Sequence, residues 1–425
     1  MSPADDSNPA ESAAAAPAKP SSRGWAAFRH RDFTVYWASQ LCAQVAMQMQ
    51  MVAIGWQLYE LTRRPLDLGL VGLAEFLPAP LLVLLTGHVA DRFERRRIVQ
   101  IGNGAQTVGA LLLLTLALHG LTSPWPIFAV AFLVGAAKAF NAPAGRAMLP
   151  NLVPVQDLAN AVAWRSTSMQ AAFVGGPALG GVLYILGPQV VYGTAACLLL
   201  TATLIMSGLR PRPAAQGGEP PSWSSVLAGI TLIWRRPVLL GAISLDLFAV
   251  LFGGAVALLP IYARDILAVG PEGLGLLRSA PAAGAVVTAL LLTHHPVTRQ
   301  VGRTLFLVVA IFGAGTILFG LSTHFQLSLA ALAVLGGADV VSVFIRSTIV
   351  PLATPDTMRG RVTAVEMVFI GASNELGAFE SGVAAALLGT VPAVVFGGIA
   401  TLVICALWIR LFPQLYRVDR LDQPL

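Results

Sequence analysis

The chain has 425 residues, of which 56% are hydrophobic and only 11% are charged. A soluble protein carries about 25% charged residues, so this composition excludes an ordinary soluble domain and indicates a polytopic helical membrane protein. The formal net charge of +6 comes from basic residues in short loops, a pattern that sets membrane orientation and does not indicate nucleic-acid binding. No disulfide framework is expected, because the cysteines lie within apolar runs: Cys42, Cys197 and Cys405.

The N-terminal stretch 1–24 is rich in Ala, Pro and Ser and has no continuous apolar segment. We therefore expect a disordered cytoplasmic tail there and no cleaved signal peptide. Twelve apolar runs follow, each close to the roughly 20 residues that cross a bilayer as a helix. In chain order they are 33–60, 67–90, 98–118, 125–147, 158–186, 189–209, 237–263, 272–293, 304–321, 327–349, 362–388 and 391–412.

The stretch 210–236, rich in Pro, Gly and Ser, separates the sixth run from the seventh. We expect a cytoplasmic linker there, between one six-helix bundle over 25–209 and another over 237–412. The remaining stretch, 413–425, is expected to be a cytoplasmic tail.

The basic residues predict the orientation of these runs. With both termini inside, the outer loops hold only Arg63, Arg64 and Arg264, while Lys138 and Arg278 lie within runs. The other 22 of the 27 basic residues then fall on the cytoplasmic side or at helix ends facing it. They include Arg146, Arg165 and Arg346. This bias predicts a membrane protein with both termini in the cytoplasm.

The two halves of the chain resemble each other at a constant offset of 201 residues. Glycine and proline limit helix geometry and allow backbones to approach, so their shared positions predict two similar six-helix repeats. The pairs are Gly69 and Gly270, Gly72 and Gly273, Pro80 and Pro281, Gly135 and Gly336, Pro150 and Pro351, Pro154 and Pro355, Gly176 and Gly377, and Gly181 and Gly382.

The hairpin between the second and third runs carries a dense charge motif. One interpretation is a loop that signals topology and nothing more. The alternative is a gating motif formed by Gly87, Asp91, Arg92, Arg95 and Arg96. In that case we expect Asp91 and Arg92 to clamp the cytoplasmic ends of the second and eleventh helices in the outward-open state, because an anion favours the positive start of a helix.

A second motif lies in the fifth run, where Gly176, Pro177, Gly180 and Gly181 form a strip of small or constrained residues. Residues four apart share a helix face, so another backbone can approach closely there. We expect the eighth run to provide the opposing surface, although ordinary helix packing is an equally good interpretation.

These features together resemble the major facilitator superfamily. The hairpin matches its loop signature except that Glu94 stands where the signature has Gly, and the strip resembles the antiporter signature of its exporters. Local strings are similar to the enterobactin-exporter-like branch, of the transmembrane secretion effector type. They are Phe28-Arg29-His30-Arg31-Asp32-Phe33, Gly69-Leu70-Val71-Gly72-Leu73-Ala74-Glu75, Pro143-Ala144, Leu149-Pro150-Asn151-Leu152-Val153-Pro154, Thr354-Pro355-Asp356-Thr357-Met358-Arg359-Gly360-Arg361-Val362 and Gly371-Ala372-Ser373-Asn374-Glu375-Leu376-Gly377.

The resemblance implies an all-α membrane protein with twelve transmembrane helices in two six-helix repeats, the major facilitator fold. It also implies a proton-coupled exporter of small organic molecules. The superfamily's basic residue early in the fourth helix, in an Arg-x-x-x-Gly pattern, is not found in that form, and the nearest basic residue is Lys138.

Polar and ionisable side chains within the runs are candidates for contact with protons or substrate, since charges are costly to place in lipid. Glu366 and Glu380 lie nearer helix ends, where they are expected to reach water. The candidates are Glu75, Lys138, Asp246, Arg278, Asp339, Asn374 and Glu375.

Lys138 and Asp339 are also 201 residues apart and so occupy the same repeat position in the fourth and tenth runs. We predict that they act as a coupled unit in a central cavity, with two separately satisfied charges as the alternative. Asp246 and Glu75 are candidate proton carriers, because a desolvated carboxylate can exchange protons near neutral pH. Neutral hydrogen bonds to a ligand are expected from Gln44, Gln48, Gln50, Asn141 and Asn374.

These patterns predict a monomeric secondary transporter in the lipid bilayer that exports a small amphipathic molecule, siderophore-like or drug-like, by proton antiport with alternating access. A proton-coupled importer and a non-transporting sensor or assembly subunit are the alternatives. No phosphate-binding loop, nucleophile–base set or metal-ligand cluster is recognisable in the sequence. We therefore expect no enzyme activity, cofactor, metal or nucleic-acid partner.

Overall fold

The computed structural model describes residues 24–210 and 223–420. The predicted tail 1–24 lies outside these ranges apart from Gly24, and so do 211–222 of the predicted linker and 421–425 of the C-terminal tail. Within the described ranges the chain forms helices and short helical turns, without a strand. The predicted all-α fold class is confirmed.

The first part of the chain forms seven helices, and their bounds follow the predicted runs closely. They are α1 (Arg31–Thr62), α2 (Pro65–Phe76), α3 (Pro78–Arg92), α4 (Arg95–His119), α5 (Trp125–Met148), α6 (Val155–Tyr184) and α7 (Pro188–Ser207). The second predicted run is divided into α2 and α3 at Leu77, because Pro78 lacks the N–H group that would continue the helical hydrogen bonds.

The second part begins with a helix inside the predicted linker and ends with a short helix after the last run. The elements are α8 (Trp223–Arg235), α9 (Pro237–Phe252), α10 (Leu259–Ile261), α11 (Gly270–His294), α12 (Val301–Leu321), α13 (Phe325–Leu352), α14 (Arg359–Leu388), α15 (Thr390–Leu411) and α16 (Pro413–Tyr416). The seventh predicted run is interrupted, because α9 ends before Gly253 and Gly254. A π-helical turn, Tyr262–Ile266, follows α10.

The predicted linker is thus partly helical within its described residues. Helix α8 packs against α14 and α9. Ile233 is buried in a cluster with Val362 and Val365 of α14, and Ile230 packs at its edge. The spacing of Ile230 and Ile233 places both on one helix face, so burial of that face stabilises α8 on the second bundle.

Nine helices in the described parts of the chain are long and apolar enough to cross a membrane. Helices α1, α6 and α14 have 32, 30 and 30 residues and coincide with predicted runs, but they are not among these nine. Each packs against helices of both halves of the chain, and such shielding from lipid permits polar side chains. The number twelve itself stays a prediction.

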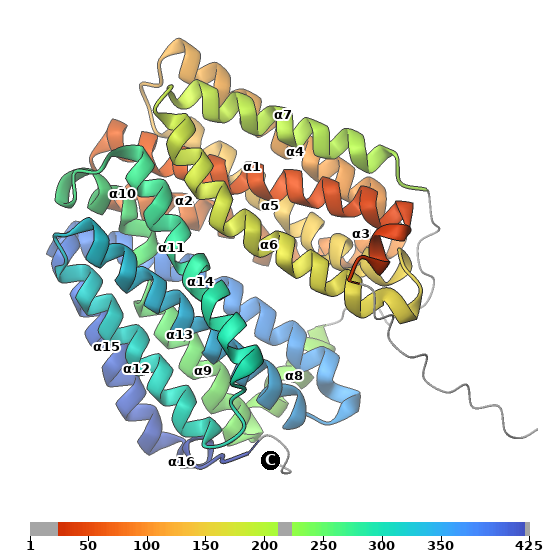
Figure 1. Ribbon diagram of the computed structural model, residues 1–425, viewed down its shortest axis with the longest axis vertical. Helices are drawn as coiled ribbons and strands as arrows, with labels where there is room; N and C mark the ends of the chain where they lie inside the picture. Colours follow the sequence, from red (N-terminus) through yellow and green to blue (C-terminus); the bar gives the residue numbers. More distant parts are fainter. Residues whose placement is uncertain (1–23, 211–222, 421–425) are drawn as a thin grey trace, which may run out of the picture.

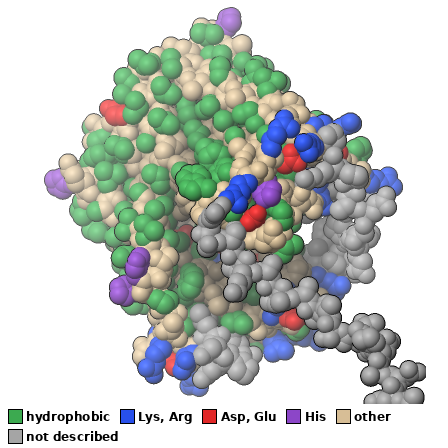
Figure 2. Space-filling view, turned by 45° about the vertical axis from the view of Figure 1, so that its right-hand side comes forward, with side chains coloured by type: hydrophobic (Ala, Val, Ile, Leu, Met, Phe, Trp, Pro, Cys, Tyr) green, Lys and Arg blue, Asp and Glu red, His purple; other side chains and the backbone are tan. Residues whose placement is uncertain are grey.

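The helices form two bundles, α1–α7 and α8–α16, that meet at one end and separate toward the other (Figure 1). They meet through α6 with α11 and through α2 with α14, and α1 also contacts α11. They separate toward α3 and α8, near the end where the chain passes from one bundle to the other (Figure 1). Figure 2 shows Lys and Arg side chains gathered near that end and hydrophobic side chains over much of the remaining visible face.

The two bundles repeat each other's close contacts, as the offset of 201 predicted. A Cβ added to Gly181 in α6 would lie 2.5 Å from the carbonyl oxygen of Pro271 in α11. A Cβ added to its repeat mate Gly382 in α14 would lie 2.9 Å from Cα of Gly69 in α2. Each glycine therefore allows a helix of one bundle to approach the start of a helix in the other.

Candidate functional site

A reciprocal set of charges joins the bundles at the end where they meet. Glu60 of α1 pairs with Arg264 of the π-helical turn at 3.3 Å, and Arg63 pairs with Asp265 at 3.2 Å. The hydroxyl of Tyr59 donates a hydrogen bond to Asp265. Each bundle therefore contributes one acid and one base to this contact, which has to open if the bundles separate at this end.

Glu75 and Lys138 form an ion pair inside the first bundle. Nζ of Lys138 in α5 donates to Oε1 of Glu75 in α2. The side chains are 35% and 14% exposed, respectively, so the pair lies partly shielded between its helices. Sequence reasoning identified both residues as candidates but did not connect them.

Two charges from the second bundle lie beside this pair. Oε2 of Glu375 in α14 would be 3.3 Å from a Cβ added to Gly72, so its carboxylate lies against α2. Arg278 of α11 interacts electrostatically with both Glu75 and Glu375. Its Nε and Nη1 atoms are buried and have no hydrogen-bond partner among the described residues. Two acids and two bases from four helices thus gather where the bundles meet.

The predicted coupling of Lys138 with Asp339 is wrong for this structure. Lys138 is held by Glu75, whereas the cation that acts on Asp339 is Arg346 of the same helix. Equal repeat positions give the two residues equal depth in their bundles, but each charge finds an opposite charge within its own bundle. The alternative of separately satisfied charges describes the observed arrangement.

Arg346 is the main residue that sequence reasoning missed. It was assigned to the cytoplasmic side by its place near the end of a run, yet its side chain is only 5% exposed and its Nη2 lies 2.6 Å from Oδ1 of Asp246. Its Nε donates to Ser342 at 3.3 Å. Asp339 and Glu366 also interact electrostatically with this pair. The seven-residue spacing of Asp339 and Arg346, two helical turns, was a usable signal of a shared face.

The strip in α6 has two faces with different partners. A Cβ on Gly180 would lie 2.8 Å from Cα of Met49, and one on Gly176 would lie 2.6 Å from Cβ of Gln48, so this face packs on α1. Gly181 and the carbonyl of Pro177 instead approach α11. The expected contact of the strip with the eighth run is therefore made by Pro177 and Gly181, whereas Gly180 packs on α1.

The charged hairpin is tied to its own bundle. Nη1 of Arg95 donates to the carbonyl of Ala147 at 2.8 Å, and Nη1 of Arg96 donates to that of Leu209 at 2.5 Å. Glu94 pairs with Arg96 and Arg97, both at 3.1 Å. Arginine at a helix C-terminus satisfies free carbonyl groups and favours the helix dipole. The side chains of Gly87 and Asp91 are outside the described part, so the predicted clamp stays a prediction.

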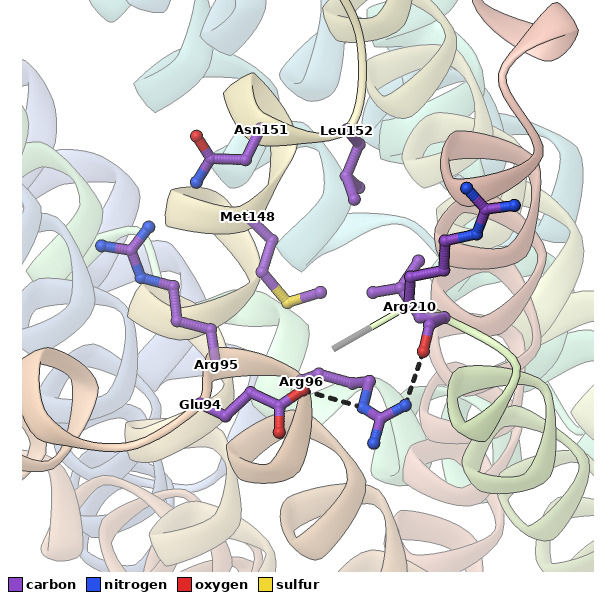
Figure 3. A pocket seen from close by; sticks show the side chains of 8 residues that line it. Glu94, Arg95, Arg96, Met148, Asn151, Leu152 and Arg210 are labelled. Carbon is purple, nitrogen blue, oxygen red and sulfur yellow. Dashed lines mark hydrogen bonds and ion pairs between the residues drawn. The ribbon is translucent and has the colours of Figure 1, made fainter. Parts of the chain in front are cut away.

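A small pocket lies at this hairpin, with a volume of about 40 Å³ (Figure 3). It is lined by side chains of the hairpin and of the ends of α5 and α7: Glu94, Arg95, Arg96, Met148, Asn151, Leu152, Leu209 and Arg210. A space of this size holds one or two waters rather than a cargo molecule. The pocket is therefore a feature of the capped helix ends.

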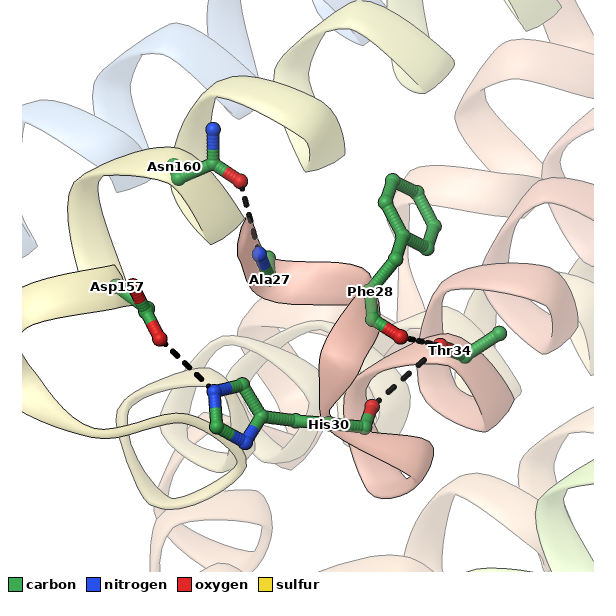
Figure 4. A network of polar contacts seen from close by, with 6 residues as sticks. All are labelled: Ala27, Phe28, His30, Thr34, Asp157 and Asn160. Carbon is green, nitrogen blue, oxygen red and sulfur yellow. Dashed lines mark hydrogen bonds and ion pairs between the residues drawn. The ribbon is translucent and has the colours of Figure 1, made fainter. Parts of the chain in front are cut away.

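The segment before α1 is fastened to the start of α6 (Figure 4). Nε2 of His30 lies 2.9 Å from Oδ2 of Asp157, and the backbone N–H of Ala27 donates to Oδ1 of Asn160 at 3.0 Å. The hydroxyl of Thr34 donates to the carbonyl of Phe28 at 3.2 Å. These contacts fix the ends of α1 and α6 relative to each other.

The predicted neutral donors are divided between packing and exposed positions. Gln48 and Gln50 are buried in α1, whereas Gln44 is half-buried. Asn141 donates to Oδ1 of Asn103 at 3.1 Å, which joins α5 to α4. Asn374 is exposed and donates to the carbonyl of Ile370 in its own helix at 2.9 Å. Of these residues, Asn374 is exposed and Gln44 and Asn141 are half-buried, so these three retain surface that is open to a ligand.

Comparison with known proteins places these features in a family. The model of the transmembrane secretion effector family matches residues 22–424. The enterobactin exporter EntS of Escherichia coli O1:K1 / APEC is 27% identical over 402 residues, which cover 91% of this chain and 93% of that protein. The same exporter of Shigella dysenteriae serotype 1 is 26% identical over 400 residues, with 91% and 93% covered.

Solved transporter structures share the fold. The nucleoside transporter NupG superposes with a TM-score of 0.64 at 16% identity, covering 90% of this chain and 98% of that one. A bacterial homologue of the human lysosomal transporter Spinster, inward-facing and occupied, gives 0.71 at 12% identity, with 91% and 97% covered. Since the family model spans almost the whole chain, the protein belongs to the transmembrane secretion effector family of major facilitator transporters.

Proposed function

We propose that the protein exports a small, amphipathic, siderophore-like molecule from the cytoplasm across the bacterial inner membrane, by proton antiport with alternating access. The observation that carries this proposal is the group of four charges from both bundles: Glu75, Lys138, Arg278 and Glu375. A movement of the bundles changes the neighbours of these charges and so links proton binding to conformation. The enterobactin exporters among the relatives support the direction and the cargo class.

The orientation follows from the basic residues. If the side that holds 22 of the 27 basic residues is cytoplasmic, both termini lie inside and the paired ends of α1 and the π-helical turn face outward. The end at which the bundles separate then faces the cytoplasm, which is the side from which an exporter takes its cargo. In that orientation we interpret the arrangement of the bundles as an inward-open state.

Proton coupling is assigned to carboxylates at two places. Glu75 and Glu375 lie where the bundles meet, and Asp246 and Asp339 surround Arg346 in the second bundle. Each acid shares a cation with another acid, so the protonation of one changes the attraction felt by the other. The membrane potential adds roughly 2.3 kcal/mol per charge per 100 mV to the driving force.

Inside-out membrane vesicles that carry the full chain test the proposal. We expect an acidic interior to drive accumulation of an iron-free catecholate siderophore, and an ionophore that dissipates the pH gradient to stop it. Glu375→Gln should abolish the response to the gradient, whereas Glu272→Gln, an exposed carboxylate of α11, should retain it. Accumulation only in right-side-out vesicles would indicate an importer, and binding without accumulation would indicate a sensor.

A further inference from the structure

Two arginines of the first bundle lie together around the buried side chain of Tyr36 in α1. The hydroxyl of Tyr36 donates to the carbonyl of Gly145 at 3.0 Å, directly before Arg146 of α5. The indole of Trp37 donates to the carbonyl of Trp164 at 3.4 Å, directly before Arg165 of α6. These contacts with α1 bring the two arginines together. Both interact electrostatically with the hydroxyl of Tyr36, and Arg165 also forms a hydrogen bond with it.

Among the side chains that the structure describes, none provides a carboxylate partner for this arginine pair. Arg146 and Arg165 interact with each other as like charges, and no ion pair of either is found in residues 24–210 and 223–420. By contrast, Lys138 and Arg346 each have an acid in contact. Neighbouring like charges repel, so a compensating anion stabilises such an arrangement.

The pair faces the other bundle. Nη1 of Arg146 reaches across to Sδ of Met367 in α14, 3.0 Å away, and its side chain is otherwise exposed. Glu366, the residue before Met367 in α14, belongs to the group of acids around Arg346 that also includes Asp246 and Asp339. Arg146 of the first bundle therefore contacts α14 directly beside one of these acids.

We propose that Arg146 and Arg165 bind an acidic group of the cargo, a carboxylate with its two oxygens in one plane. A guanidinium group donates two parallel hydrogen bonds to such a group, and the negative charge reduces the repulsion between the two arginines. Tyr36 and Gln40 act as positioning residues, since Nε2 of Gln40 would lie 3.4 Å from a Cβ added to Gly145. The inference rests on the proposed export function and names the part of the cargo that this site recognises.

A rival role for the same arginines is a cytoplasmic gate. In this role, Arg146 and Arg165 would approach Glu366 when the bundles close at this end. An ion pair between these arginines and Glu366 would then hold the closed state. That role requires no affinity for an anion in the inward-open state. A direct measurement of anion binding to the protein therefore distinguishes the two roles.

The test uses the full chain in nanodiscs of neutral phosphatidylcholine and measures the affinity for 2,3-dihydroxybenzoate and for catechol, which share a ring and differ by a carboxylate. We expect the wild type to prefer 2,3-dihydroxybenzoate by about tenfold or more. Arg146→Gln and Arg165→Gln should each remove this preference. Arg165→Lys should keep part of it, because the charge remains while the paired geometry is lost. Arg97→Gln is the matched control, since Arg97 is a 72% exposed arginine of the cytoplasmic hairpin.

A wild type without the preference, or a preference that survives in Arg146→Gln and Arg165→Gln, overturns the site. An equal loss in Arg97→Gln overturns it as well, because general positive charge then accounts for the binding. If Arg146→Gln and Arg165→Gln leave the affinity for 2,3-dihydroxybenzoate unchanged but alter the ratio of inward-open to outward-open molecules, the two arginines belong to the gate. Export in vesicles is a separate measurement: its failure with the preference intact rejects the proposed transport and leaves the anion site standing.

Discussion

Asp246 and Arg346 form a buried ion pair that joins α9 to α13, with Oδ1 and Nη2 2.6 Å apart. The side chains are 9% and 5% exposed, so both ions have lost most of their hydration. Such a pair is retained because removal of one partner leaves an uncompensated buried charge. Asp339 and Glu366 add negative charge nearby, so Arg346 holds this acidic cluster together.

Arg346→Met should therefore destabilise the second bundle severely. We expect a loss of about 3–5 kcal/mol, the typical effect of breaking a buried pair. The double variant Arg346→Met with Asp246→Asn should recover part of the loss, since the isolated charge is removed with its partner. Thermal unfolding of the purified protein in detergent measures both. A double variant less stable than Arg346→Met would contradict a pairwise role for Arg346.

Lys138 should be coupled to Glu75 and independent of Asp339. In a double-mutant cycle, Lys138→Met and Glu75→Gln should each reduce stability, and their combination should be less harmful than the sum because neither charge is left alone. The cycle of Lys138→Met with Asp339→Asn should be additive within about 0.5 kcal/mol, as is usual for residues that share no partner. The reverse result, coupling to Asp339 alone, would show that the observed pair is not maintained in the membrane.

The comparison of these two pairs shows what the sequence was able to predict. Apolar runs predicted the bounds of most long helices within a few residues, and the Gly and Pro offset predicted two similar repeats, which fits the matching approaches of Gly181 to α11 and Gly382 to α2. Depth in the membrane follows from chain position, so Glu75, Lys138 and Asp339 were found as candidates inside the apolar runs. Which charges meet depends on the rotation and tilt of each helix, and a sequence offset does not specify these.

The ion pair of Arg346 could not be predicted for the same reason, because it depends on how its helix is rotated. A basic residue near a helix end is consistent with the positive-inside rule, whether its side chain reaches water or turns back toward a carboxylate. The linker illustrates another limit: Pro, Gly and Ser predicted a break between bundles, but the apolar face that holds α8 on α14 was short enough to escape notice. In both cases the structure depends on a neighbour that is distant in the sequence: Asp246 for Arg346, and α14 for α8.

The ion pairs of Arg63 with Asp265 and of Glu60 with Arg264, which join the two bundles, should each have a small effect on conformation. Arg63 and Asp265 are 53% and 38% exposed, so their pair is screened by water and contributes at most about 1 kcal/mol. Arg63→Ala should therefore change the ratio of inward-open to outward-open molecules by less than about tenfold. Combined with Arg264→Ala, which removes the second pair, the shift toward the outward-open state should be larger.

Spin labels at Thr122 and Thr323, both exposed, allow this shift to be measured as a distance distribution by electron paramagnetic resonance. The swap of Arg63→Asp with Asp265→Arg should restore the wild-type distribution if the ion pair is the cause. Arg64→Ala serves as the control, because Arg64 is a neighbouring exposed arginine without an ion pair in the described parts of the chain. An equal shift in Arg64→Ala would attribute the effect to net charge.

The two faces of the α6 strip should respond differently to a single added methyl group. In Gly180→Ala the Cβ would lie 2.8 Å from both Cα and the carbonyl oxygen of Met49, so α1 and α6 have to move apart. We expect a loss of about 1–3 kcal/mol, as is typical of overpacking. In Gly181→Ala the Cβ would lie 2.5 Å from the carbonyl of Pro271, across the contact between the bundles.

Gly180→Ala should therefore lower thermal stability within the first bundle, whereas Gly181→Ala should mainly weaken the contact of α6 with α11 and favour separation of the bundles at that end. Gly175→Ala is the matched control, because its Cβ would meet nothing within 4 Å. Replacement of glycine by alanine within a helix is otherwise favourable by roughly 1 kcal/mol, so the control should be neutral or slightly stabilising. Thermal unfolding and the distance between labels at Thr122 and Thr323 separate the two effects. If Gly181→Ala lowers stability as Gly180→Ala does and leaves the distance unchanged, α6 and α11 do not form the moving contact.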